Sequence, residues 1–408
     1  MTRRDLFDTL LALKLNGAIP ADDAPAPDLG NLYDFLWTAG KNRLGLSFLD
    51  PRWKTLEEWK RTARPFFRQH LSFDPPALPV GGEVLGREER DGFHIERVQI
   101  RATEAHSIPG WLLVPSQQRR RLPGVVAIHC HGGCYVLGHE KILSRPEDPE
   151  YAVRYREQAY GRPYAEYLAR RGFVVLVIDG FYFGSRRLAV ESLAPDNAVP
   201  SMRSALAALA NLKPKSTEWY SAVDRVCGDF EHLTAKTIFA AGATWPGMLV
   251  WDDRRSVDYL CSRPEVDPDR IGCIGLSIGG LRTSHLVAAD PRIKAACIVG
   301  WMTTFRTQLH KHLRHHTWMI YVPGQYAAMD FPDAVGMMAP NALLVQQCSR
   351  DSLYPMEGLK ASVAKLEAIW SKAGVPDRFR GTFHDLPHSF TPPMQEEAFD
   401  WLEKWLKA

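Results

Sequence analysis

One short stretch, residues 270–283, constrains the fold of this chain more than any other. It reads RIGCIGLSIGGLRT, so a buried apolar run at residues 271–274 leads into a glycine-bracketed serine and then into a helical pattern. Gly275 and Gly279 lack the Cβ atoms that would collide in a sharp strand-to-helix turn. Such a turn lifts the Ser277 hydroxyl out of the sheet and points free helix N–H groups toward it. The stretch therefore predicts a strained turn that presents a serine.

Strand and helix patterns alternate from Gly92 onward. Buried apolar runs at residues 124–130 and 172–179 end in glycine-containing turns, and a helical pattern at residues 160–170 lies between them. This alternation predicts an α/β fold, with right-handed crossovers and a mostly parallel central sheet that has helices on both faces. With 408 residues and 45% hydrophobic content, the chain can bury the core that such a sheet needs. We expect the other elements as strands at residues 94–100, 111–115, 293–299, 341–348 and 379–383, and a C-terminal amphipathic helix at 396–406.

Two regions do not fit a plain alternating sheet. Residues 1–90 lack the alternation, and the helical patterns at 6–13 and 56–67 predict a helical N-terminal extension packed on a catalytic domain at residues 91–408. A long stretch at about residues 185–250 contains two helical patterns where a short crossover would be enough. We interpret this stretch as a lid-like insertion over the C-terminal ends of the strands, where open α/β sheets bind their ligands.

Charge and cysteine content restrict the partners of the chain. A formal net charge of +3, with acidic and basic residues mixed along the sequence, gives no reason to expect a nucleic acid or a membrane surface. A small-molecule substrate is therefore expected, and a homo-oligomer is one option for the assembly. Seven cysteines without CxxC spacing indicate a reducing compartment, so we expect a cytoplasmic protein. Arg3 and Arg4 leave export by a twin-arginine signal as the alternative, although charged residues interrupt the apolar segment that follows.

The pentapeptide GLSIG at residues 275–279 resembles the nucleophile elbow of α/β-hydrolases. In that fold the oxyanion hole takes one backbone N–H from the residue after the serine, which is Ile278 here. A second N–H comes from a turn after an upstream strand, and the sequence His131-Gly132-Gly133 follows the buried run at residues 124–130. We expect the backbone N–H of Gly133 or Cys134 to be this second donor, whereas a tight turn that simply needs glycine is the structural alternative.

A serine hydroxyl is a poor nucleophile at neutral pH, so it needs a base and a carboxylate that orients the base. In the α/β-hydrolase order the acid follows the serine, and Asp351 follows the expected strand at residues 341–348. Asp330 and Asp333 are weaker candidates because they follow no strand. Asp179 ends a buried strand but precedes the serine, so we expect it to anchor its own loop through hydrogen bonds.

Two histidines follow the last expected strand. His388 is the candidate base because it lies deeper in the loop before the C-terminal helix, whereas His384 ends the strand. In this interpretation His388 takes the proton of Ser277 and later protonates the leaving group, while Asp351 fixes the tautomer of His388.

Four further histidines at residues 310–316 raise the question of a metal. No cysteine or carboxylate set accompanies them at zinc-like spacing, and a serine triad needs neither a metal nor a cofactor. We therefore expect no metal and no cofactor, and we interpret these histidines as part of a basic helix near the rim of the pocket.

Over about residues 90–408 the chain resembles the acetyl xylan esterase-like and dienelactone hydrolase-like branch of the α/β-hydrolases. The likeness rests on DDRRSVDYL at residues 252–260, RPEVDPDRIG at 263–272 and the elbow. It implies hydrolysis of carboxylic esters, usually with small acyl groups, through an acyl-enzyme. The serine nucleophile, the N-terminal extension and the insertion at 185–250 depart from the minimal dienelactone hydrolase pattern, in which the nucleophile is a cysteine.

Three functions are compatible with these features. The leading hypothesis is a serine carboxylesterase that acts on short-acyl or small esters, such as those of an acetylated carbohydrate or a xenobiotic. A peptidase or amidase related to prolyl oligopeptidase shares the elbow and the chain order, but the N-terminal region contains no propeller repeat. A catalytically silent binding protein is the third alternative, although such proteins usually lose a member of the triad.

Overall fold

The computed structural model describes residues 27–39, 44–76, 78–116, 120–193 and 200–407. The helical pattern at residues 6–13 and the arginine pair at positions 3 and 4 lie outside these ranges. Within the described residues, no helix is both long and apolar enough to cross a lipid bilayer.

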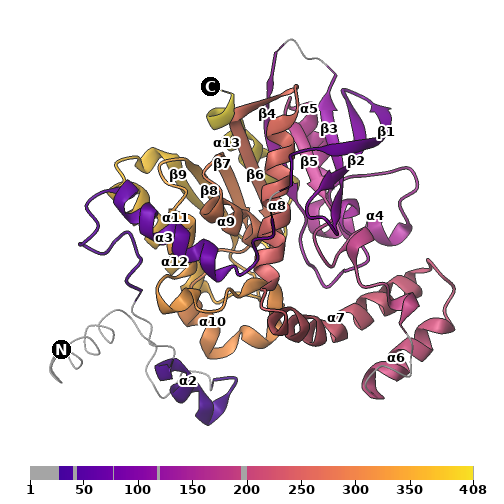
Figure 1. Ribbon diagram of the computed structural model, residues 1–408, viewed down its shortest axis with the longest axis horizontal. Helices are drawn as coiled ribbons and strands as arrows, with labels where there is room; N and C mark the ends of the chain where they lie inside the picture. The colour runs from indigo at the N-terminus through magenta and orange to yellow at the C-terminus, as the bar shows by residue number, and fades with distance from the viewer. Residues whose placement is uncertain (1–26, 40–43, 77, 117–119, 194–199, 408) are drawn as a thin grey trace.

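A nine-stranded sheet forms the centre of the described chain (Figure 1). Its spatial order is β1-β2-β3-β5-β4-β6-β7-β8-β9. The pairs β1–β2, β2–β3 and β3–β5 are antiparallel, and all later pairs are parallel, which confirms the mostly parallel sheet. The strands are β1 (Gly82–Arg90), β2 (Phe93–Arg101), β3 (Ser107–Pro115), β4 (Leu122–Ile128), β5 (Val174–Ile178), β6 (Val266–Leu276), β7 (Ile293–Val299), β8 (Ala342–Cys348) and β9 (Phe379–His384).

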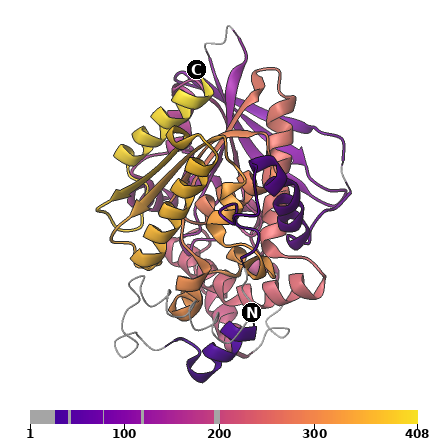
Figure 2. The ribbon, with the colours of Figure 1, turned by 90° about the vertical axis from the view of Figure 1, so that its left-hand side faces the viewer.

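The central strands are apolar on both sides because helices cover both faces of the sheet. Successive residues of β4 illustrate this: Val126 belongs to one buried core and Val125 to the other. Figure 2 shows α3 and α13 on opposite sides of the sheet. The first core packs against α8 (Trp245–Ser262), α9 (Ile278–Ala289), α11 (Phe331–Gly336) and α12 (Met356–Lys372), and the second against α5 (Tyr164–Arg170) and α13 (Pro392–Leu406).

The N-terminal extension contains two described helices, α2 (Tyr33–Ala39) and α3 (Leu56–His70). The hydroxyl of Thr55 caps α3 by accepting a hydrogen bond from the backbone N–H of Glu58 at 3.2 Å. Trp59, Ala63 and Phe67 recur at every fourth position and are fully buried, so one face of α3 packs on the catalytic domain.

The boundary expected at residue 90 needs a correction, because β1 lies before it and belongs to the sheet. The helical part of the extension ends at His70. Seven of the nine residues of β1 are exposed and its sequence is GEVLGREER, so this edge strand lacks the apolar alternation that reveals a half-buried strand.

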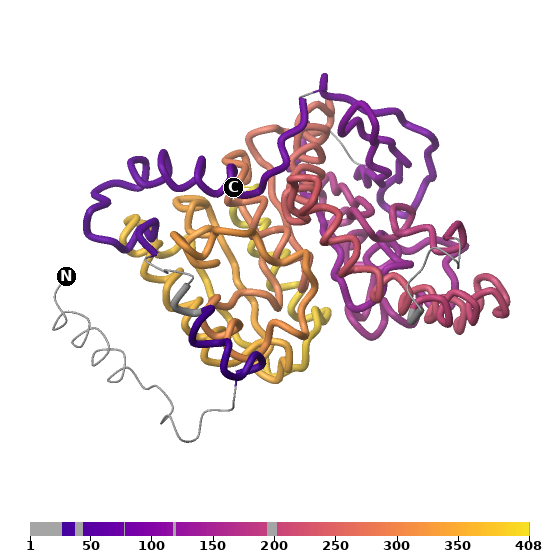
Figure 3. Tube along the Cα trace, turned by 60° about the horizontal axis from the view of Figure 1, so that its bottom comes forward, coloured from indigo at the N-terminus to yellow at the C-terminus, as the bar shows by residue number. Residues whose placement is uncertain are grey.

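The expected insertion forms a helical hairpin, α6 (Pro200–Ala210) and α7 (Thr217–Ala240), which extends away from the sheet in Figure 3. Asp224 ties α7 to the catalytic domain, since its carboxylate accepts hydrogen bonds from the backbone N–H groups of Tyr135 and Val136 at 2.6 and 2.8 Å. Both donors follow β4, so α7 lies at the C-terminal edge of the sheet.

The helix expected at residues 160–170 is α5, which begins four residues later, and a further helix, α4 (Glu150–Tyr160), precedes it. Gly161 separates them because it adopts φ 72°, the left-handed conformation that ends a helix. The remaining regular elements are α10 (Phe305–Lys311) and short 3₁₀ helices at Gly30–Leu32, His139–Lys141, Gly184–Arg186, Val190–Ser192, Leu313–His315, Trp318–Ile320, Gln325–Ala327 and Pro376–Arg378.

Candidate active site

Ser277 occupies the strained turn that the glycine pattern predicts. It lies between β6 and α9 with φ 61° and ψ −120°, a conformation that non-glycine residues rarely adopt. A Cβ atom on Gly275 would lie 2.5 Å from the carbonyl carbon of Gly279, and one on Gly279 would lie 2.5 Å from the carbonyl oxygen of Ile128. The turn therefore tolerates only glycine at these two positions, and the backbone N–H of Ser277 locks it by donating to Val299 O at 2.8 Å.

His388 and Asp351 meet in a short hydrogen bond. The Nδ1 atom of His388 lies 2.5 Å from Oδ2 of Asp351, and the other carboxylate oxygen accepts the backbone N–H of Leu353 at 2.9 Å. A carboxylate can only accept, so Nδ1 carries the proton and Nε2 of the neutral imidazole keeps its lone pair. The two residues meet because β8 and β9 are parallel neighbours, which brings the loops after them to the same edge of the sheet.

The imidazole of His388 lies beside the serine turn. A Cβ atom on Gly300 would be 3.3 Å from Cε1 of His388 and 3.1 Å from Cδ1 of Leu276, the residue before the serine. Gly300 directly follows Val299, the acceptor of the Ser277 backbone N–H. Within the described residues the Ser277 hydroxyl makes no hydrogen bond of its own. A serine–histidine hydrogen bond often tightens only in the substrate complex.

The rival histidine and acids make other contacts. Nε2 of His384 faces the carboxylate of Glu397 on α13 at 3.2 Å, so His384 is directed away from Asp351. Asp330 is the N-cap of α11 and accepts the backbone N–H groups of Phe331 and Phe305 at 2.8 and 2.9 Å. Burial raises the pKa of Asp330 to about 6. Asp333 closes the same capping box, so both acids organise a helix end.

Asp179 anchors its loop, as the sequence predicts. The fully buried carboxylate accepts the backbone N–H groups of His139 and Ser185 at 2.8 and 3.0 Å and the Ser185 hydroxyl at 2.7 Å. His139, Glu140 and Asp179 are the one set of three potential metal ligands within 4.8 Å in the described ranges. The carboxylate of Asp179 already bonds Nδ1 of His139 at 3.0 Å, which gives this set a structural explanation.

The histidines at residues 310–316 point to different neighbours. His310 packs edge-on against Tyr33 of α2, and His316 stacks on Tyr354 with the ring centroids 4.9 Å apart. Tyr354 in turn lies 6.4 Å from the ring of His388. Burial lowers the pKa of His316 to about 4, so this imidazole is neutral at physiological pH.

The turn after β4 lies against the elbow, because Gly279 packs on the carbonyl oxygens of Ile128 and His129. Gly132 and Gly133 have φ 61° and 65°, so the glycines satisfy a left-handed turn. The two N–H groups singled out from the sequence are engaged inside this turn. Gly133 N–H donates to Nδ1 of His131 at 2.9 Å, and Cys134 N–H donates to the His131 carbonyl at 3.2 Å. The backbone N–H groups of His131 and Gly132 have no acceptor among the described residues.

Glu231 on α7 holds this turn, and sequence reasoning missed it. Its Oε1 atom accepts from Nε2 of His131 at 3.1 Å, from the Tyr135 hydroxyl at 2.8 Å and from the Thr317 hydroxyl at 2.8 Å. Because Nδ1 of His131 accepts from Gly133, Nε2 must carry the proton. Burial would raise the pKa of Glu231, but the hydrogen bonds from His131, Thr317 and Tyr135 hold it below its usual value. No local pattern marks Glu231, since its partners lie far away in the sequence.

A buried ion pair joins the helix after the elbow, α9, to its neighbour α8. Arg282 on α9 donates to both carboxylate oxygens of Asp253 on α8, at 3.0 and 2.5 Å. Both side chains are almost completely buried, and the bidentate geometry fixes the angle between the two helices. Asp253 belongs to the DDRRSVDYL segment, which explains part of that motif structurally.

Comparisons with known proteins found one relative in sequence and several in structure. No family model matches the chain. A Bacillus subtilis (strain 168) protein described as "Putative hydrolase YtaP" is 26% identical over 337 residues, which cover 81% of this chain and 95% of that protein.

Solved structures of esterases share the architecture. A "putative acetyl xylan esterase" from Bacteroides fragilis NCTC 9343 aligns with a TM-score of 0.64 at 14% identity, over 90% of this chain and 85% of that one. A glucuronoyl esterase from Solibacter usitatus aligns with a TM-score of 0.57 at 16% identity, over 85% of this chain and 93% of that one. The strand order, the strained serine turn and these similarities together show that the chain has the α/β-hydrolase fold.

Proposed function

We propose that the chain is a serine hydrolase that cleaves carboxylic esters. Ser277 is the nucleophile, His388 the general base and Asp351 the carboxylate that orients the base. The observation that carries this proposal is the 2.5 Å hydrogen bond from His388 Nδ1 to Asp351 beside the strained serine turn. It leaves Nε2 as the free base, and the turn exposes the hydroxyl that this base would deprotonate.

The reaction follows from these roles. Nε2 of His388 takes the Ser277 proton while Oγ attacks the ester carbonyl carbon, and the carbonyl electron pair moves onto oxygen. The backbone N–H of Ile278 and an N–H of the turn at residues 131–134 donate to this oxyanion. The imidazolium then protonates the leaving alcohol, and an acyl-enzyme remains. Water, deprotonated by His388, attacks the acyl carbon and releases the acid and free Ser277.

Within this turn, the N–H groups of His131 and Gly132 are more available to the oxyanion than those of Gly133 and Cys134. Gly133 and Cys134 already donate to His131. A donor that first has to break a hydrogen bond would stabilise the oxyanion less.

The substrate class is proposed as a carbohydrate ester with a small acyl or alkyl group. Two of the similar structures are described as an acetyl xylan esterase and a glucuronoyl esterase, and both act on esters of sugars by name. Glu231 and Asp224 of α7 contact the turn after β4, so this helix lies where it could contact a substrate larger than a simple ester.

The test is hydrolysis of p-nitrophenyl esters from acetate to decanoate, together with a peptide p-nitroanilide. We expect the wild type to cleave the short esters best, to leave the anilide intact and to be labelled by a fluorophosphonate. Ser277→Ala should lose both turnover and labelling. Ester hydrolysis that survives in Ser277→Ala would refute the nucleophile. Preferential cleavage of the anilide would favour a peptidase, and no turnover or labelling at all would favour a binding protein.

A further inference from the structure

A concave surface lies far from Ser277. It is a groove of about 800 Å³ between α3 and α8 that also touches Ala289, the last residue of α9. Ser277 precedes the first residue of this 12-residue helix, so the two sites lie roughly 18 Å apart along it. Ser277, Asp351 and His388 do not line the groove.

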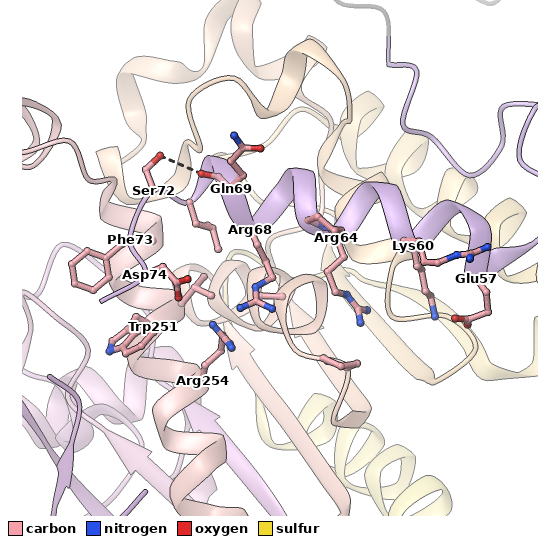
Figure 4. Close-up of a pocket in the computed structure, with 17 residues that line it drawn as sticks. Glu57, Lys60, Arg64, Arg68, Gln69, Ser72, Phe73, Asp74, Trp251 and Arg254 are labelled. Carbon is pink, nitrogen blue, oxygen red and sulfur yellow. Dashed lines mark hydrogen bonds between the residues drawn. The ribbon is translucent and has the colours of Figure 1, made fainter. Parts of the chain in front are cut away.

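Cationic side chains dominate the lining. Two carboxylates, Glu57 and Asp74, face five cations: Lys60, Arg61, Arg64, Arg68 and Arg254. Figure 4 shows that Arg68 from α3 and Arg254 from α8 point into the same part of the groove, next to Asp74.

Some of these cations have protein partners and others do not. Arg64 donates to the carbonyl oxygens of Ala288 and Met337 at 3.0 and 2.8 Å, and Lys60 donates to Ala339 O, so both serve the packing of α3. Arg68 and Arg254, by contrast, form no ion pair within 4.0 Å in the part of the chain that the structure describes. The Nε atom of Arg254 is buried without an acceptor there.

The electrostatics of the groove match this imbalance. Burial lowers the pKa of Arg254, and repulsion from Arg68 lowers it further. The carboxylates of Asp290, Asp258 and Asp74 act in the opposite direction on Arg254. Asp290 is itself paired with Arg292 at 2.5 Å, so it does not neutralise the groove completely. A buried N–H donor and two unpaired guanidinium groups are the features of a site that accepts an anion.

We propose that this groove binds a small organic anion, whose phosphate or carboxylate group is held by Arg68 and Arg254. A guanidinium group presents paired N–H donors that match the oxygens of either group. The organic part would lie toward Phe73 and Trp251, whose rings meet edge-on at 6.3 Å at one end of the groove. Arg68 comes from α3 and Arg254 from α8, so the N-terminal extension and the catalytic domain would each supply one side of this site.

Calorimetric titration of the full chain tests the proposal. The probes are phenyl phosphate, benzoate and the neutral benzyl alcohol, which share an aromatic ring and differ in charge. We expect at least one of the two anions to bind and the alcohol not to bind. Arg68→Ala and Arg254→Gln should each weaken that binding about ten- to a hundredfold, the usual effect of losing a charge-assisted contact. Stronger binding of one anion identifies the group as phosphate or carboxylate.

Two controls make the result specific. Arg154→Ala removes a surface arginine on α4 whose one ion pair among the described residues is with Glu150, and it should leave binding unchanged. Arg68 is exposed and forms no hydrogen bond or ion pair in the described chain, so Arg68→Ala should keep the circular dichroism spectrum and the rate of p-nitrophenyl acetate hydrolysis. No binding of either anion, equal binding of the alcohol, or unchanged affinity in both groove variants would overturn the proposal. These readouts do not depend on ester hydrolysis.

Discussion

The elbow at Ser277 and the turn after β4 lie side by side, but they are held in different ways. Backbone crowding holds the elbow, because a Cβ atom on Gly275 or on Gly279 would lie 2.5 Å from a neighbouring backbone atom. Side chains hold the turn, since Glu231 from the distant helix α7 binds His131, which in turn accepts the N–H of Gly133. Steric crowding between backbone atoms does not depend on pH, whereas a hydrogen bond to a carboxylate does.

The largest expected effect is the loss of kcat when Ser277 or its proposed base is removed. Ser277→Ala and His388→Ala should each lower kcat for p-nitrophenyl acetate by roughly 10⁴-fold or more, because each removes a member of a unit that acts together. His384→Ala is the matched control, since His384 contacts Glu397 and not Asp351. Steady-state kinetics on folded variants check this. Equal losses in the two histidine variants would contradict the assignment of His388.

The steric constraint on the elbow can be tested by adding one methyl group. Gly279→Ala would place a Cβ atom 2.5 Å from the Ile128 carbonyl oxygen, and backbone cannot move aside as a flexible side chain can. We expect the free energy of unfolding to fall by about 1–3 kcal/mol, together with a loss of activity. Urea denaturation measures it. Gly374→Ala is the control for a glycine substitution, since nothing lies within 4 Å of its Cβ position and only its positive φ opposes the change. A Gly279→Ala protein as stable and active as the wild type would show that the elbow is not sterically locked.

The hydrogen bonds that hold the turn after β4 can be removed at Glu231. Glu231→Ala leaves the Nε2 proton of His131 without its acceptor, so the turn loses its support while Ser277 and His388 stay intact. We expect kcat to fall by about 10- to 100-fold with little change in KM, because the turn acts on the oxyanion and not on the ground state.

Glu231→Gln keeps an oxygen acceptor and should recover part of this activity. Thr317→Val removes one of the three hydrogen bonds to Glu231 and should lower kcat less than Glu231→Ala does. If Glu231→Ala raised KM and left kcat unchanged, the residue would belong to substrate binding and not to the positioning of the turn.

The smallest expected effect is the pH dependence of stability. The pKa of Glu231 is depressed in the folded protein, so its ionised form adds stability above the unfolded pKa of about 4.3. This contribution is lost as the pH falls through the folded pKa. The wild type should therefore lose more stability between about pH 5 and pH 3 than Glu231→Gln does. Denaturation midpoints across that range measure the difference, and parallel curves would mean that Glu231 does not stabilise the fold through its charge.

Much of the sheet could be predicted because its central strands are buried on both faces. The strand expected at residues 293–299 is β7 with the same ends, and the strand expected at 341–348 is β8 with one residue fewer. Edge strand β1 was missed because its exposed, charged sequence carries no periodic signal. The break at Gly161 was missed because helical spacing continues across it, although the chain turns there in a left-handed conformation.

The sequence by itself determined the elbow, because a Cβ atom on Gly275 would collide with Gly279 only four residues away, so one short stretch carries the constraint. It also predicted Asp351 and His388 as the acid and the base from chain order and strand ends, and the structure brings these two side chains into a hydrogen bond. Only the tertiary structure decided which N–H groups of the turn at residues 131–134 are free, because that depends on how His131 is held. His131 and Glu231 are 100 residues apart, and the meeting of Arg68 with Arg254 likewise joins two helices that no local pattern relates. Contacts of this kind depend on packing, which the sequence encodes only through the whole fold.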